Sequence, residues 1–292
     1  MSRQKSALVT GCSSGIGYSI AKELAKRGWK VFACARRLQP MESLCEEYPD
    51  RIAIFKMDVS STESIEEGYK FVSERLEDGK LDLLYNNAGA SCTFPAIDVP
   101  DDALVQCFSV NVEGPIRLTR KFSRMLIKAE GTIAFTGSLA GIMPFPWGSV
   151  YGASKAAIHQ YASILAFEMQ PFNVRVINFV TGGVNTNIGD KRPLPEDSIY
   201  NFPETRKSFV VRQRMAADNH PMEPALYASK AVNSIENKCM GKVVVRLGTG
   251  ATTLWLAYYL VPRWLMLFAL KMKFGLNAVW SVIRSGDYKK NE

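Results

Sequence analysis

The chain has 292 residues, of which 47% are apolar and 22% are charged. This composition is typical of a folded globular protein with a large core, and it excludes an intrinsically disordered chain. The formal net charge is +8 without a long run of Lys or Arg, which argues against nucleic acid as a partner and favours phosphorylated ligands or an anionic membrane surface.

Short apolar runs alternate with amphipathic helical patterns along most of the chain. The expected strands cover residues 6–10, 30–35, 51–59, 81–87, 132–137, 174–180 and 242–248, and the expected helices cover 15–28, 41–48, 62–77, 101–128 and a stretch that begins at 149. This alternation is typical of a parallel sheet with helices on both faces. We therefore predict an α/β fold, a Rossmann-like doubly wound parallel sheet of about seven strands.

The turn after the first strand is rich in glycine. It reads TGCSSGIG and lies directly between the strand and the first helix. Glycine permits a tight turn and a close approach of the backbone, and the helix N-terminus then faces a pyrophosphate. The candidate cofactor-binding residues of this turn are Thr10, Gly11, Ser13, Ser14, Gly15, Ile16 and Gly17.

The same turn also fits a pattern from another class of enzyme. Gly11 to Gly15 reads G-x-S-x-G, the nucleophile elbow of lipases and esterases, with Ser13 as the nucleophile. The chain has two histidines, His159 and His220, that could serve as the base. Such matches arise easily inside phosphate-binding loops, so a triacylglycerol lipase or esterase stays an alternative.

The end of the second strand indicates which dinucleotide binds. An acidic residue there would accept a hydrogen bond from the ribose hydroxyl of NAD, but the sequence has Arg36 and Arg37. Two guanidinium groups suit the 2′-phosphate of NADP(H). Further candidates for the cofactor site follow the third and fourth strands, namely Asp58, Val59, Asn87, Ala88 and Gly89.

A second group of side chains has the chemistry of proton transfer. Ser138 follows the strand 132–137, and Tyr151 and Lys155 lie four residues apart, on one face of a helix. An ammonium group near a phenol favours the phenolate and lowers the pKa of the tyrosine. Ser138 would hydrogen-bond the oxygen that gains or loses this proton, and Asn111 is a polar residue within a long helical pattern.

Together these motifs resemble the short-chain dehydrogenase/reductase family over about residues 6–248. The resemblance implies a catalytic tetrad of Asn111, Ser138, Tyr151 and Lys155. It also implies that Tyr151, Lys155, Val184, Thr186 and Arg120 contact the cofactor, and that the protein forms dimers or tetramers. We accordingly assign residues 1–248 to an NADP-binding reductase domain and 249–292 to a C-terminal segment and tail.

A narrower resemblance concerns the substrate. The segments CARRLQPM, GKLDLLYNNAG, SCTFPAID and DKRPLPEDSIYNFPE are similar to the NADPH-dependent 1-acyldihydroxyacetone-phosphate reductases of yeasts. The resemblance implies reduction of the acylated ketone phosphate to 1-acylglycerol 3-phosphate, lysophosphatidic acid, in phosphatidic acid biosynthesis. A steroid or retinoid dehydrogenase of the 17β-hydroxysteroid type is the alternative within the family.

Residues 187–219 are too long for a plain connection, so we expect a lid over the active site. This segment carries six basic side chains, Lys191, Arg192, Arg206, Lys207, Arg212 and Arg214. Some of them could hold a substrate phosphate, while a solvated lid face accounts equally well for most of them.

The C-terminal part contains an apolar run over 251–270 that Pro262 and Arg263 interrupt. A central arginine disfavours a straight span, so a broken or interfacial insertion of residues 251–275 fits better. We expect attachment to the endoplasmic reticulum membrane and to lipid droplets, with the catalytic domain on the cytosolic side, and the mitochondrial outer membrane as a further candidate. The alternative is a helix pair that packs on its own subunit or on a dimer partner.

Overall fold

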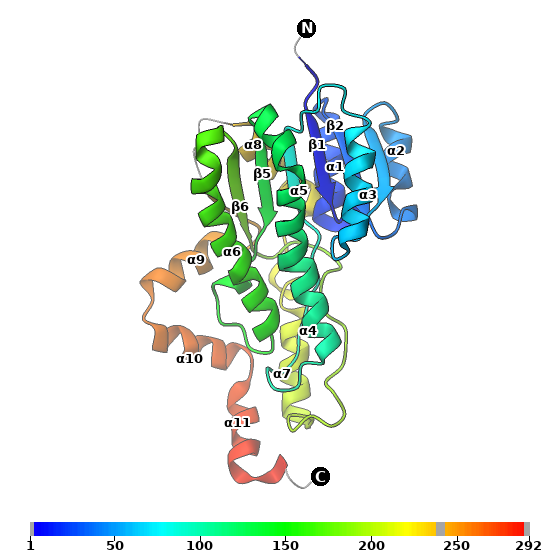
Figure 1. Cartoon of the computed structure of the whole chain (residues 1–292). Coiled ribbons are helices and arrows are strands. Elements are labelled where there is room, and N and C mark those ends of the chain that lie inside the picture. The colour runs from blue at the N-terminus through cyan, green and yellow to red at the C-terminus, as the bar shows by residue number, and fades with distance from the viewer. Residues whose placement is uncertain (1–2, 238–242, 289–292) are drawn as a thin grey trace.

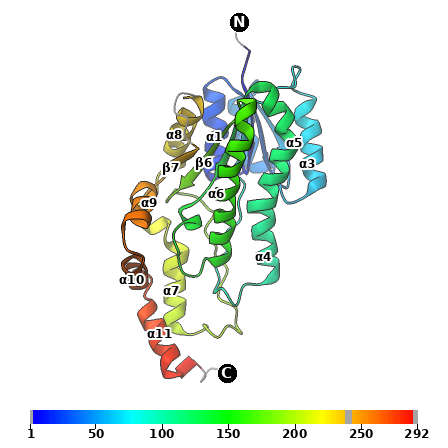
Figure 2. The ribbon, with the colours of Figure 1, turned by 60° about the vertical axis from the view of Figure 1, so that its left-hand side comes forward.

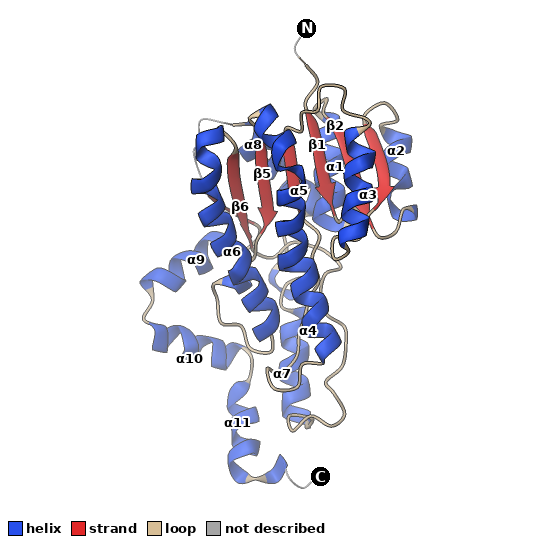
Figure 3. Cartoon of the chain, viewed as in Figure 1, coloured by secondary structure: helices blue, strands red, loops and turns tan. Residues whose placement is uncertain are grey.

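A computed structural model describes residues 3–237 and 243–288 and contains a parallel sheet of seven strands (Figures 1 and 3). The strands are β1 Ser6–Thr10, β2 Lys30–Ala35, β3 Ile52–Lys56, β4 Leu83–Asn86, β5 Thr132–Thr136, β6 Arg175–Thr181 and β7 Val244–Leu247. Their order is β3-β2-β1-β4-β5-β6-β7, and every neighbouring pair is parallel. The predicted fold class and all seven strands are confirmed, although Lys242, at the start of the predicted last strand, lies outside the described residues.

The strands form a sheet because both of their faces are buried under helices. Leu8 pairs in register with Phe32 and Leu84, and these three pack in one core, whereas their neighbour Val9 belongs to the other core. One face is covered by α1 Gly15–Lys26, α2 Glu42–Glu47 and α8 Pro224–Glu236, and the other by α3 Thr62–Ser73, α5 Gly114–Ala129 and α6 Ser149–Met169 (Figures 1 and 2). Two layers of buried apolar side chains therefore hold the sheet rigid.

The helix predicted over 101–128 is interrupted. It consists of α4 Asp101–Phe108, the π-helical turn η2 Ser109–Glu113 and α5. Helix α8 was not predicted at all, although Pro224 at its first turn and the buried Tyr227 and Ile235 are typical helix signals. Short 3₁₀ turns complete this part of the fold, namely η1 Gln39–Met41, η3 Leu139–Gly141, η4 Gln170–Phe172 and η5 Ala217–Asn219.

The C-terminal segment forms three helices beyond the carboxyl end of the sheet, α9 Ala251–Leu260, α10 Arg263–Lys273 and α11 Leu276–Ser285 (Figures 1 and 2). The expected interruption at Pro262 is present, because α9 ends before it and α10 begins after it. The inner side of α10 packs against Met143 through Met266, Leu270 and the following Phe274. α11 lies beside α7 Pro203–Arg214, the helix of the segment that the sequence predicts to be a lid. The predicted packing on the same subunit therefore accounts for one side of the segment.

The opposite side of these helices is apolar and exposed. Exposed side chains there include Leu256, Tyr259, Leu260, Trp264, Leu267, Phe268, Met272 and Trp280. Among the described residues, no single helix meets the length and hydropathy expected of a membrane span, whereas α10 and α11 meet them as a pair that bends by 86°.

Candidate functional site

The predicted proton-transfer residues meet at the carboxyl edge of the sheet, where ligands bind in open α/β folds. Ser138 follows β5 and caps the 3₁₀ turn η3, and its Oγ accepts a hydrogen bond from Ala140 N at 3.1 Å. Tyr151 and Lys155 lie in the first two turns of α6. Ser138 and Tyr151 are both half-buried, and the Ser138 side chain lowers the pKa of Tyr151 by hydrogen bonding, so the two hydroxyls lie close together.

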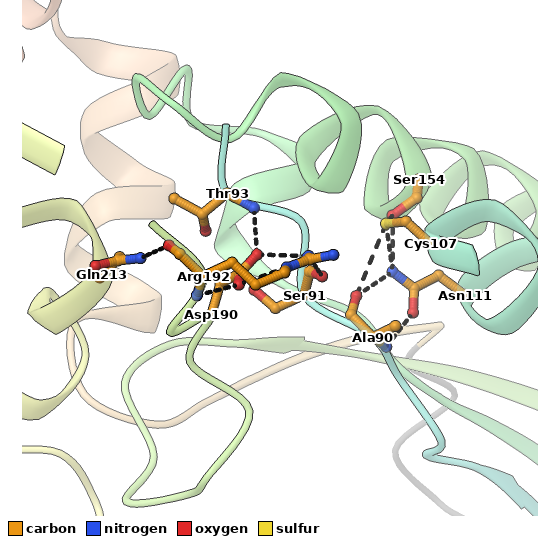
Figure 4. Close-up of polar contacts among 9 residues, drawn as sticks. All are labelled: Ala90, Ser91, Thr93, Cys107, Asn111, Ser154, Asp190, Arg192 and Gln213. Carbon is orange, nitrogen blue, oxygen red and sulfur yellow. Dashed lines mark hydrogen bonds and ion pairs between the residues drawn. The ribbon is translucent and has the colours of Figure 1, made fainter. Parts of the chain in front are cut away.

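Asn111 connects the long helix to the loop after β4, as Figure 4 shows. Its Oδ1 accepts from Ala90 N at 2.8 Å, and its Nδ2 donates to Ala90 O at 2.9 Å and to Ser154 Oγ at 3.0 Å. Ser154 Oγ in turn donates to Tyr151 O at 2.8 Å. A side chain inserted into a helical ladder opens a π-helical turn, and here the turn lets a buried amide hold three elements together. Ser154 was not predicted from the sequence.

Lys155 is almost fully buried, and its Nζ donates to Thr136 O at 2.9 Å. Burial disfavours the ammonium form and lowers the pKa of Lys155 to about 8. Its Nζ lies 5.8 Å from the ring centroid of Tyr151. The amine thus stands close to the phenol, as the spacing predicted.

The charge that acts on Tyr151 differs from the expected one. Burial raises the pKa of Tyr151, while the Ser138 hydrogen bond and the positive charge of Arg212 lower it, and the net direction is upward. The sequence argument expected Lys155 to lower this pKa, whereas the positive charge that lowers it is that of Arg212. Arg212, from the lid helix, was not singled out by the sequence.

The glycine turn has the shape that close approach to a phosphate requires. Gly11 and Gly15 have φ of +70° and +60°, values that other residues rarely adopt. A Cβ on Gly17 would lie 2.5 Å from Gly11 O, and one on Gly15 would lie 3.0 Å from Thr186 Cγ2. Ser14 precedes α1 as its N-cap residue. Glycine is therefore needed at each of these three positions of the predicted pyrophosphate turn.

Hydrogen bonds tie this turn to the ends of the neighbouring strands. Thr10 Oγ1 accepts from Asn87 N and Ala88 N at 3.0 Å each. Asn87 Nδ2 donates to Thr10 O at 3.0 Å, and its Oδ1 accepts from Thr136 Oγ1 at 3.1 Å. Gly89 continues this loop toward Asn111, whose Oδ1 would lie 3.5 Å from a Cβ on Gly89. The predicted proton-transfer and cofactor residues thus form one connected edge.

The loop after β6 closes the same edge. A cavity of about 270 Å³ lies between the glycine turn and this loop. Gly15, Tyr18, Ser19, Asn185, Thr186, Asn187, Glu223 and Pro224 line it. Val184 is buried beneath the loop, and Thr186 Oγ1 donates to Val184 O at 3.4 Å. Thr186 thus lies beside the glycine turn, and its contact with the cofactor stays a prediction.

Asp58 and Arg36 lie near each other at the next strand ends. Burial alone would raise the pKa of Asp58, but hydrogen bonds from Ser60 N and Oγ and the charge of Arg36 outweigh it and lower the pKa. Arg36 and Arg37 are exposed immediately after β2. An ionised carboxylate can accept from an amino group, and free guanidinium groups can bind a phosphate, so this side of the edge fits the adenosine 2′-phosphate half of NADP(H).

The side chains of two predicted cofactor residues do not lie at this edge of the sheet. The side chain of Val59 is buried in the core, where Gly114 packs against it. Arg120 is exposed on α5, and within the described residues its side chain has no hydrogen bond or ion pair with another predicted site residue. Their cofactor roles stay predictions that these side-chain positions do not favour.

The lipase alternative receives no support from the histidines. His159 Nε2 accepts from Ser138 N at 3.1 Å, and burial lowers the pKa of His159 to about 4. His220 follows η5, and its carbonyl accepts from Thr249 Oγ1. Within residues 3–237 and 243–288, no hydrogen bond joins Ser13 to either histidine. The nucleophile elbow therefore lacks its base.

An ion pair within the segment 187–219 is hydrogen-bonded to the loop after β4 (Figure 4). Arg192 Nη2 lies 2.7 Å from Asp190 Oδ2, and it also donates to Ser91 O at 3.1 Å. Asp190 Oδ2 accepts from Thr93 N at 2.8 Å. A second cavity, of about 440 Å³, lies beside this ion pair and includes Ala90, Gln106 and Ile188 in its lining.

Comparisons with known proteins agree with this site. The family described as short chain dehydrogenase matches residues 5–197. The NADPH-dependent 1-acyldihydroxyacetone phosphate reductase of Saccharomyces cerevisiae is 53% identical, over 99% of this chain and 97% of its own length. The enzyme of the same name from Schizosaccharomyces pombe is 36% identical, over 76% of this chain and 74% of its own.

A solved short-chain dehydrogenase from Streptomyces avermitilis has a TM-score of 0.77 and 26% identity, over 98% of this chain and 99% of its own. Family match, sequence identity and fold thus point to one class of protein. The chain belongs to the short-chain dehydrogenase family.

Proposed function

We propose that the protein reduces 1-acyldihydroxyacetone phosphate with NADPH and forms 1-acylglycerol 3-phosphate, a precursor of phosphatidic acid. The observation that carries this proposal is the 53% identity to the yeast reductase across 99% of the chain. The glycine turn and the two arginines after β2 provide groups that suit NADPH.

The chain's own residues supply the proton chemistry of a ketone reduction, while NADPH supplies the hydride. Tyr151 donates a proton to the ketone oxygen, and Ser138 Oγ hydrogen-bonds that oxygen. Lys155 stands beside the phenol, and Asn111 holds the first turn of α6 through Ser154. The same arrangement serves a secondary alcohol in the reverse direction.

The test is NADPH consumption by purified protein with a panel of ketones. We expect 1-acyldihydroxyacetone phosphate to be reduced with a kcat/KM well above that of the phosphate-free 1-acyldihydroxyacetone. A preference for a steroid or retinoid ketone would instead support the alternative dehydrogenase. Hydrolysis of a triacylglycerol that depends on Ser13 would support the esterase.

We further propose that α9–α11 attach the protein to a membrane or lipid-droplet surface. The support is the exposed apolar side of these helices together with charge: residues 251–285 carry Arg263, Lys271, Lys273 and Arg284 and no acidic side chain. Apolar groups with basic neighbours suit an anionic interface. We place the protein at the endoplasmic reticulum and at lipid droplets, with the sheet on the cytosolic side and the mitochondrial outer membrane as a further candidate. Fractionation of cells that express a tagged chain tests this location.

The subunits are expected to associate as dimers or tetramers, as the family resemblance implies. Light scattering of the detergent-solubilised protein would measure the mass of the assembly, and a monomeric mass would contradict this expectation.

A further inference from the structure

The lid helix α7 brings one arginine into the catalytic edge. Arg212 is half-buried in the last turn of this helix, and its charge acts on both Tyr151 and Asp190. A Cβ on Gly148 would lie 3.0 Å from Arg212 Nη2, so the glycine leaves room for the guanidinium three residues before Tyr151. The same guanidinium lies 5.7 Å from the ring centroid of Phe145.

Arg212 is short of partners where it lies. Its Nε is buried without a hydrogen-bond partner in the described part of the chain. Asp190, the acidic group whose charge reaches it, is already held by Arg192 through two nitrogen–oxygen contacts of 2.9 and 2.7 Å. A buried cationic donor that lacks an acceptor is costly. The position therefore calls for an anion that residues 3–237 and 243–288 do not provide.

The other five basic residues of the lid are either paired with a polar side chain or exposed. Arg192 pairs with Asp190, Arg214 pairs with Asp218, and Arg206 donates to Asn201. Lys191 and Lys207 are exposed. Of the six lid cations, Arg212 combines burial, an unused donor and contact with the catalytic edge.

We propose that Arg212 binds the phosphate group of the ketone substrate and so sets the preference of the active site for phosphorylated ketones. This assignment rests on the proposed function. In the proposed substrate, one methylene and one ester oxygen separate the ketone carbon from phosphorus. A ketone held at Ser138 and Tyr151 would therefore have its phosphate only a few bonds away, within the region where the charge of Arg212 acts on Tyr151. The planar fork of a guanidinium matches two phosphate oxygens.

The exchange of Arg212 for methionine tests the assignment, because it removes the charge and keeps most of the length. For 1-acyldihydroxyacetone phosphate, we expect kcat/KM to fall about 100-fold, the loss of a charge-assisted pair of hydrogen bonds. The kcat/KM for phosphate-free 1-acyldihydroxyacetone should fall much less, because it loses only the effect of the Arg212 charge on Tyr151. The Kd for 1-acylglycerol 3-phosphate, measured by calorimetry with NADP⁺ present, should rise in parallel.

Two further variants make this result interpretable. Lys207→Met removes an equal charge from the exposed side of the same helix and should leave both substrates unaffected. Arg212→Lys keeps the charge but loses the fork, and it should fall between wild type and Arg212→Met. Because this variant is the milder change, it also covers the case in which Arg212→Met does not fold.

The assignment is wrong if Arg212→Met lowers kcat/KM for both ketones equally, or leaves the preference for the phosphorylated ketone intact. An equal loss with a shifted pH profile would show that Arg212 acts only through Tyr151. A wild-type protein that reduces both ketones equally well would instead overturn the proposed function, and the assignment with it. The wild-type comparison thus distinguishes the two failures.

Discussion

At the scale of single residues, the environment of Tyr151 decides how a phenol can serve as a proton donor. Burial raises its pKa, and the Ser138 hydrogen bond and the charge of Arg212 work in the opposite direction. A protonated phenol at neutral pH is the form that reduction requires. The structure therefore favours the donor state, and the two polar neighbours determine how readily the proton leaves.

Replacement of Tyr151 by phenylalanine removes the proton donor and little else. We expect kcat for ketone reduction to fall by about 10²–10⁴, the usual contribution of a general acid. The circular dichroism spectrum should be unchanged, and the Kd for NADPH, measured by fluorescence, should change far less than kcat.

The matched control is Tyr161→Phe, which removes a hydroxyl from a core tyrosine on the same helix, where the ring packs on Phe135 at 5.9 Å. This variant should keep near wild-type turnover. Normal turnover by Tyr151→Phe would remove the basis of the proposed reaction.

Lys155 is expected to weaken the fold at neutral pH. Its pKa is about 8 in the folded protein against 10.5 for the free side chain, so the unfolded state binds more protons between these values. The free energy of unfolding consequently rises with pH in this window. Lys155→Met should be more stable than wild type at pH 7, by about 2 kcal/mol after loss of the bond to Thr136 O.

This gain should shrink as the pH rises from 8 to 10.5, which urea denaturation of both proteins at several pH values would measure. Lys230→Met, an exposed change on α8, should show no such trend. A Lys155→Met protein that is less stable at every pH would contradict the burial argument.

At the scale of elements, the lid depends on one buried carboxylate. The side chain of Asp190 is 3% exposed, and that of Arg192 is 39% exposed. Burial would raise the pKa of Asp190, but its bonds to Arg192 and Thr93 N lower it. A lowered carboxylate pKa contributes stability at neutral pH that is lost as the pH falls through the folded-state pKa. The lid should therefore loosen in acid.

Asp190→Asn should destabilise the lid by about 2 kcal/mol, because it leaves Arg192 without its charge partner. The expected observation is faster limited proteolysis within 187–219 at neutral pH. Asp218→Asn breaks the exposed pair with Arg214 and should change the rate little. Equal rates for the two variants would show that the buried pair does not hold the lid.

The elements differed in how well the sequence predicted them. The strands were predictable because runs such as SALVT and KVFACA are buried on both faces and end at turns. The π-helical turn at Asn111 was not, since it depends on hydrogen bonds to Ala90 and Ser154 from other elements. For the same reason Arg212 could not be told apart from the other lid arginines: its lack of a partner arises only when Asp190 has bound Arg192.

At the scale of the whole molecule, the C-terminal helices have two different sides. Met266 and Leu270 of α10 are 7% and 8% exposed, whereas Trp264 and Phe268 of the same helix are 71% and 55% exposed. Both sides are apolar, so packing on the catalytic domain explains only one of them. The other side is the proposed membrane contact.

A double change of Trp264 and Phe268 to glutamate should abolish membrane binding without unfolding the domain, since neither side chain is buried. We expect the wild-type protein to float with anionic phospholipid vesicles and the double variant to stay in the dense fraction. Phe167→Glu is the control, because Phe167 is 77% exposed on α6, outside the C-terminal helices. Flotation of the double variant would contradict the proposal.

Phe145 lies between the C-terminal helices and Arg212. Its ring packs on Phe274 at 6.3 Å and lies beside the Arg212 guanidinium. One aromatic side chain therefore separates the C-terminal helices from the Arg212 guanidinium. If these helices lie on a membrane as proposed, an amphiphilic substrate would reach Arg212 from the bilayer leaflet without dissolving in bulk water. Turnover should then follow the mole fraction of ketone in the leaflet, so diluting the surface with inert phospholipid should slow the enzyme even when the total substrate is constant.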